Sequence, residues 1–132
     1  MTESQHITLR ELQRRVKSAL EGQFALPLWV SAEISEIKVN YSGHCYLELV
    51  EKGGDNGVPT AQARAVVWRS NSPRIAGYFE AETGQRLAAG IKILAKALVT
   101  YHELYGFSLQ ITDIDPSYTL GDMAVSYTHL TL

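Results

Sequence analysis

The chain of 132 residues has one cysteine, no long apolar segment and no excess of positive charge. A single cysteine excludes a disulfide within the chain and is typical of a reducing compartment, so we expect a cytoplasmic protein. The longest uninterrupted apolar run, 65–68, is far too short to cross a bilayer. The net charge of -2 argues against a globally basic nucleic-acid-binding protein, although local clusters of charge can still form a basic groove.

Motifs that carry catalysis or bind metal are also missing. The four histidines have neither partner cysteines nor the spacing of zinc ligands, and the sequence contains no Walker-type loop or nucleophile elbow. Asp113 and Asp115 are two residues apart, but an Asp-Ile-Asp-Pro sequence at a strand end is more typical of a turn than of a magnesium site. We therefore expect no catalytic residue, metal or other cofactor in this domain.

The first segment with clear periodicity predicts a helix over residues 8–22. Thr8 is suited to the N-cap, and Glu11 stands three residues later, where it would complete a capping box. Gly22 is suited to end the helix. We expect the helix to pack on the rest of the domain through one apolar face, formed by Leu9, Leu12, Val16 and Leu20.

Five short strands are predicted after this helix. They cover 28–38, 44–51, 61–69, 91–101 and 107–114, with a turn at 40–43 and a loop at 52–59. Ser72 and Pro73 predict the start of a short helix that ends near Gly84. Five strands with a helix between the third and fourth is the order of an OB-fold, so the expected class is a mainly β Greek-key barrel.

The predicted organisation has three parts. Residues 1–22 form the N-terminal helix packed on the barrel, and 23–118 form the OB-fold nucleic-acid-binding domain. Residues 124–132 follow neither helical nor strand periodicity clearly, so 119–132 are predicted to be a truncated linker or an added tail.

Four sequence pieces, in order, carry a family resemblance. They are TLRELQRRVKSALE, WVSAEISEIKVNYSGHCYLELVE, AVVWR and LQITDIDPSYTLGDMA. With them the chain resembles the N-terminal domain of the exodeoxyribonuclease VII large subunit over roughly residues 7–124. The resemblance implies an OB-fold that binds single-stranded DNA, in an enzyme that degrades it from either end into oligonucleotides. It also implies a small-subunit partner, bound through regions absent from this chain, and leaves open whether the full enzyme needs a divalent metal.

Strand alternation indicates which side chains would meet the DNA. In the second predicted strand, Cys45, Leu47 and Leu49 alternate with His44, Tyr46 and Glu48, and the two sets must face opposite sides. We place the first set in the core. An outward imidazole and phenol beside cationic side chains would offer ring faces on which bases stack and positive charge that attracts phosphates.

The third strand and the loop after the fourth strand complete the predicted site. Small alanines suit a crowded barrel interior, so Arg64 and Trp68 are placed outward, with a core tryptophan as the alternative. Tyr101 and Tyr105 flank the loop that borders the usual ligand face of an OB-fold. The predicted nucleic-acid-binding residues are Lys38, Ser42, His44, Tyr46, Arg64, Trp68, Arg69, Tyr101 and Tyr105.

Other interpretations stay open at this point. A basic group on the first helix, Arg10, Arg14, Arg15 and Lys17, is most often a solvated face, although it could meet DNA phosphates or a partner. The domain could also be an RNA-binding OB module, such as the anticodon-binding domain of a tRNA synthetase. A protein-interaction OB barrel is the third interpretation, and the net charge of -2 favours it.

Overall fold

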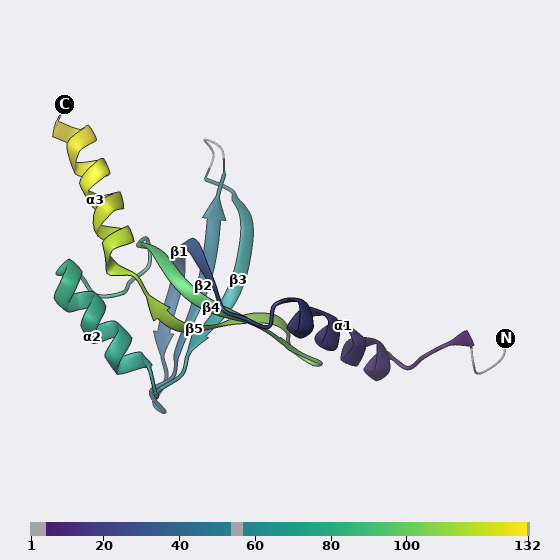
Figure 1. Cartoon of the computed structure of the whole chain (residues 1–132). Coiled ribbons are helices and arrows are strands. Elements are labelled where there is room, and N and C mark those ends of the chain that lie inside the picture. Colours follow the sequence, from purple (N-terminus) through teal and green to yellow (C-terminus); the bar gives the residue numbers. More distant parts are fainter. Residues whose placement is uncertain (1–4, 54–56, 132) are drawn as a thin grey trace.

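A five-stranded closed barrel with three helices forms the fold (Figure 1). The computed structural model describes residues 5–53 and 57–131, with side chains as far as residue 123. The elements are α1 (Leu9–Gln23), β1 (Leu28–Val39), β2 (Cys45–Lys52), β3 (Pro59–Val67), α2 (Ser72–Thr83), β4 (Lys92–His102), β5 (Gly106–Ile114) and α3 (Pro116–Thr131). None of the described helices is long and apolar enough to span a membrane.

The barrel closes in the order β1-β2-β3-β5-β4, which confirms the predicted OB-fold. All neighbouring strands are antiparallel except β3 and β5, which pair in parallel. Strand β1 pairs with β4 through its first half and with β2 through its second half. A register shift between Ile34 and Glu36 marks the change of partner, and such a bulge lets one strand bend around the barrel.

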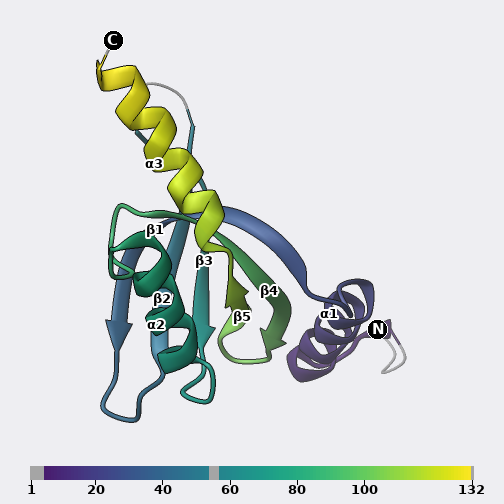
Figure 2. The same ribbon diagram turned by 60° about the vertical axis from the view of Figure 1, so that its left-hand side comes forward.

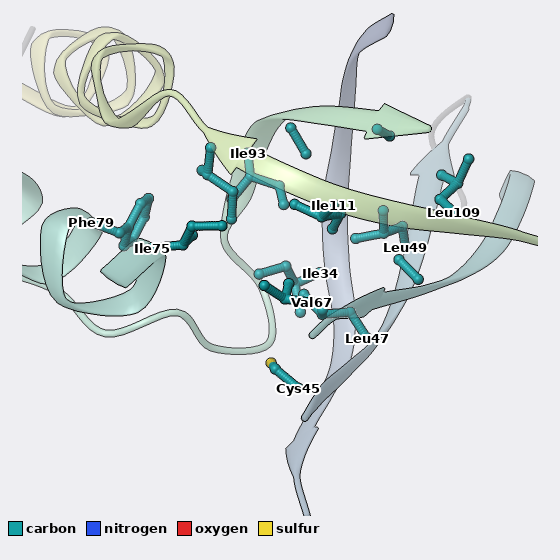
Figure 3. Packing of buried hydrophobic residues seen from close by; sticks show 14 residues of the cluster. Ile34, Cys45, Leu47, Leu49, Val67, Ile75, Phe79, Ile93, Leu109 and Ile111 are labelled. Atoms are coloured by element: carbon teal, nitrogen blue, oxygen red, sulfur yellow. The ribbon is translucent and has the colours of Figure 1, made fainter. Parts of the chain in front are cut away.

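The core follows the predicted alternation. Cys45, Leu47 and Leu49 of β2 are buried, as are Ile93, Ala95 and Ala97 of β4. On α2, Ile75 and Phe79 join the same buried cluster, and Figure 3 shows both side chains directed from the helix toward the barrel interior. Trp68 is 39% exposed, so its outward placement is confirmed and the alternative of a core tryptophan is wrong.

Helix α1 begins as predicted but packs less than predicted. The Thr8 hydroxyl accepts a 3.1 Å hydrogen bond from the Glu11 backbone N–H, and the helix continues one residue past Gly22. No residue of the helix is buried, and Leu9 and Leu12 are exposed. Helix α1 contacts β4 and lies on the opposite side of the barrel from α2 (Figure 2).

Helix α3 (Pro116–Thr131) covers most of the segment, 119–132, that was predicted to be a linker or an added tail. It begins at Pro116 directly after β5, and the Asp115 side chain caps its first turn. One Asp115 carboxylate oxygen accepts hydrogen bonds from the backbone N–H (2.9 Å) and the hydroxyl (2.6 Å) of Ser117. Buried Thr119 then donates a 2.7 Å hydrogen bond to the Lys92 carbonyl, which ties the helix to β4.

Candidate nucleic-acid interface

A groove of about 610 Å³ lies on the outer surface of the barrel, over β2, β3, β5 and β4. It brings together five of the nine predicted residues, namely Tyr46, Arg64, Trp68, Tyr101 and Tyr105. The other lining residues are Lys17, Glu21, Ala65, Val66, Thr100, His102, Gly106, Ser108 and Gln110. The other four predicted residues do not line this groove; they are Lys38, Ser42, His44 and Arg69.

Strand register explains why the groove floor contains these side chains. Tyr46 of β2 is opposite Val66 of β3, and Val66 is in register with Gln110 of β5. Residues opposite each other in paired strands project from the same face, so these three side chains form a row across the sheet. Lys38 of β1 is opposite Tyr46 and extends this row by one strand, although it does not line the groove.

Three aromatic rings cluster at one end of the groove. The ring centroids of His44 and Trp68 are 5.0 Å apart at 86°, and those of His44 and Tyr46 are 6.5 Å apart at 77°. Tyr46 is 44% exposed, so it and Trp68 both offer aromatic surface to a ligand. His44 meets the Trp68 ring edge-on, and its Nδ1 atom accepts a 3.0 Å hydrogen bond from the backbone N–H of Arg69.

The β1–β2 turn is held against the end of β3. The Asn40 side-chain oxygen accepts hydrogen bonds from the backbone N–H groups of Ser42 (3.0 Å) and His44 (3.1 Å). Gly43 has a φ of 91°, and a Cβ atom at this position would be 3.3 Å from the Cβ of Arg69. The glycine therefore permits both the left-handed conformation and the close approach. In this structure Ser42 contributes to the turn through its backbone.

The β4–β5 loop forms the opposite wall. The rings of His102 and Tyr105 are stacked, with centroids 4.7 Å apart and planes at 27°. His102 Nδ1 accepts a 3.0 Å hydrogen bond from the Leu104 backbone N–H, which fixes the ring within the loop. The Arg64 guanidinium donates a hydrogen bond to the Tyr105 carbonyl.

Helix α1 supplies a third wall, although none of its residues is among the nine predicted binding residues. Glu21 accepts a 3.3 Å hydrogen bond from the Tyr101 backbone N–H, and the Tyr101 hydroxyl donates to the Gln13 side chain. Lys17 lies one turn from each of them and lines the groove. The three polar residues recur every four positions, which puts them on one helical face. That spacing is visible in the sequence, but it does not show that Tyr101 is the partner of Gln13 and Glu21.

The cationic side chains at the site differ in whether they have a carboxylate partner. Lys17 Nζ is 3.5 Å from Glu103 Oε1. A hydrogen bond from its own backbone and the nearby Lys17 charge hold the pKa of Glu103 below its ordinary value. Among the described residues, no carboxylate lies within 4.0 Å of Lys38, Arg64 or Arg69. These three cations are therefore available to an anionic ligand.

The two aspartates considered for a metal make local hydrogen bonds. Asp113 accepts a 2.9 Å hydrogen bond from the Ile114 backbone N–H, and Asp115 caps α3. Within the part of the chain that the structure describes, no three His, Cys, Asp or Glu side chains gather where they could hold a metal ion.

The comparisons with known proteins agree with this geometry. A family model described as an OB-fold nucleic acid binding domain matches residues 7–115, so the chain is a nucleic-acid-binding domain of the OB class. The exodeoxyribonuclease 7 large subunit of Deinococcus radiodurans is 37% identical, and the match covers 92% of this chain and 30% of that protein. The chain therefore belongs to the exodeoxyribonuclease VII large-subunit family, which confirms the resemblance seen in its motifs.

A second curated relative and one solved structure are also similar to this chain. The exodeoxyribonuclease 7 large subunit of Bacillus mycoides is 27% identical over 97% of this chain and 25% of that protein. The chain thus spans less than a third of the length of these curated relatives. Among solved structures, the N-terminal domain of the PriB protein from Thermoanaerobacter tencongensis, described as dimeric, has a TM-score of 0.43 and 9% identity. That match covers 69% of this chain and 94% of the PriB chain.

Proposed function

We propose that the groove binds single-stranded DNA and that this domain guides the substrate of an exodeoxyribonuclease VII large subunit. The observation that carries the proposal is the placement of two half-exposed rings, Tyr46 and Trp68, beside the Arg64 guanidinium in one groove. Bases of any sequence can stack on such rings, and cations at the rim neutralise phosphates. Unpaired bases present both faces, which a duplex does not, so the site favours a single strand.

The nine residues predicted from the sequence divide into roles under this proposal. Tyr46, Trp68, Tyr101 and Tyr105 would meet bases, whereas Lys38, Arg64 and Arg69 would meet phosphates. His44 and Ser42 would contact the DNA strand at the edge of the aromatic cluster, where the β1–β2 turn meets β3.

The family membership supports a wider proposal about the complete enzyme. We propose that it hydrolyses single-stranded DNA from either end into oligonucleotides in the cytoplasm, together with a small subunit. Cleavage is assigned to the part of the relatives' length that this chain does not span. The role of this domain would be to hold the strand and present it for cleavage.

A binding titration tests the proposal. Labelled single-stranded DNA, RNA of the same sequence and the DNA duplex are titrated with the chain over a series of salt concentrations. We expect weak binding to single-stranded DNA with little sequence preference, and log affinity that falls with log salt by about 0.7 per phosphate contacted. Preference for RNA would favour an anticodon-binding type of module. No binding at low salt would leave the protein-interaction barrel.

A further inference from the structure

The β4–β5 loop holds both cationic side chains that line the groove. Lys17 pairs with the Glu103 carboxylate, and Arg64 donates to the Tyr105 carbonyl. Glu103 does not itself line the groove but borders a neighbouring hollow beside Arg10 and Arg14. The ion pair therefore directs the Lys17 ammonium to the rim of the groove, toward the loop.

The backbone of Lys17 is anchored while its ammonium stays free to change partner. Gln13 and Glu21, one turn on either side, are both bonded to Tyr101 of β4, so α1 is fixed against this wall of the groove. The lysine side chain is 39% exposed and that of Glu103 is 33% exposed. A lysine has a flexible four-carbon stem and a compact charge, so its ammonium can turn from the loop toward the groove without movement of the helix.

We infer that Lys17 is a phosphate-binding residue of the single-strand site, and that Glu103 competes for its ammonium in the free protein. This inference rests on the proposed function. When a strand enters the groove, a phosphate takes the place of the Glu103 carboxylate. The exchange is feasible because an ion pair between partly exposed side chains is weak, and because phosphate binding also releases counterions from the DNA.

The exchange predicts opposite effects of two conservative substitutions. Glu103→Gln removes the competing charge, so affinity for a single strand should rise roughly two- to fivefold, the range of one exposed ion pair. The salt dependence should stay as in the unmodified chain, because Lys17 contacts phosphate in both complexes. Lys17→Gln should lower affinity and make the log-log salt slope shallower by about 0.7.

The double variant and a matched control separate competition from a general effect of charge. Competition predicts that Glu103→Gln has almost no effect once Lys17→Gln is present. The control is Glu80→Gln on α2, which breaks a pair with Arg86 (3.6 Å) and changes net charge equally, away from the groove. We expect this control to bind as the unmodified chain does.

Fluorescence anisotropy with one labelled single-stranded oligonucleotide measures all five proteins over a salt series. Equal effects of Glu103→Gln and Glu80→Gln would overturn the inference, and so would an effect of Glu103→Gln that persists beside Lys17→Gln. An unchanged salt slope in Lys17→Gln would also overturn it. If the unmodified chain binds no single strand at low salt, the proposed function itself fails, which is a different result from binding without coupling between Lys17 and Glu103.

Discussion

His44 and Arg69 are joined by a hydrogen bond in which the Arg69 backbone N–H donates to the imidazole Nδ1 atom at 3.0 Å. The same imidazole meets the Trp68 ring almost at a right angle. The histidine thus links the start of β2 to the residues just after β3, and it holds the tryptophan in place. The proton on a neutral ring must then lie on Nε2, because Nδ1 is the acceptor.

Substitution of His44 should separate the hydrogen bond from the ring contact. His44→Ala loses both contacts. We expect its free energy of unfolding to be lower by about 0.5–1.5 kcal/mol and its DNA binding to be weaker. In His44→Asn, the side-chain oxygen is as many bonds from Cα as Nδ1 is, so the bond to Arg69 can persist. We expect this variant to keep most of the stability but to bind as weakly as His44→Ala.

Urea unfolding and DNA titration of both variants check this expectation. If His44→Asn is as unstable as His44→Ala, the hydrogen bond to Arg69 is not the stabilising contact. Normal DNA binding by His44→Asn would instead show that the ring does not position Trp68.

Cys45 should make stability depend on pH in the alkaline range. Burial raises the pKa of its thiol, so the folded protein binds this proton more tightly than the unfolded chain, whose thiol ionises near pH 8.5. The stabilisation is complete below that unfolded pKa and is lost as pH rises through the folded pKa. We expect the unfolding free energy of the unmodified chain to fall relative to that of Cys45→Ala between about pH 7 and about pH 10.

Urea unfolding of both proteins at several pH values measures this difference. The subtraction removes titrations that the two proteins share, such as those of tyrosine and lysine. A difference that stays constant over this range would contradict the prediction.

Most of the barrel could be predicted because its strands are buried on one face only. Leu47 and Leu49 alternate with polar side chains, and a shift by one residue would expose them, so the pattern determines the register. The alanines of β3 settle the orientation of Trp68 in the same way. The sequence therefore identified the aromatic cluster and the strands that carry it.

Contacts between distant segments could not be predicted from the same patterns. Gln13 and Tyr101 are 88 positions apart, and nothing local to either residue indicates the partner. Asp115 and Pro116 can end a strand or begin a helix, and both occur here, because β5 leads directly into α3. Glycine and threonine in α3 are weak helix formers, which obscured its periodicity.

The chain alone should not cleave DNA. Asp113 and Asp115 are bonded to backbone N–H groups, and the described residues contain no cluster suited to holding a catalytic metal. Labelled single strands incubated with the pure chain should stay intact with and without magnesium. Cleavage that Asp113→Asn abolishes would contradict this expectation. Asp115→Asn is a suitable companion variant, because asparagine also caps a helix well.

Neighbouring residues of β2 should show opposite effects on binding and stability. Tyr46 faces the groove and is 44% exposed, whereas Leu47 is 3% exposed within the core. Tyr46→Ala should weaken single-strand binding by about 1–3 kcal/mol, the contribution of one stacked base, and leave folding largely intact. Leu47→Ala should lower the free energy of unfolding by about 2–5 kcal/mol, because it leaves a cavity in the barrel.

Binding and melting must both be measured for this pair, because either result alone has two explanations. Weak binding by Tyr46→Ala counts as a lost contact only if the variant melts near the temperature of the unmodified chain. Binding by Leu47→Ala is measured well below its melting temperature, where the groove is still formed and affinity should be close to normal. If Tyr46→Ala unfolds the domain while Leu47→Ala mainly loses DNA binding, the assigned faces of β2 are reversed. The row from Lys38 through Tyr46 to Gln110 would then not be the binding surface.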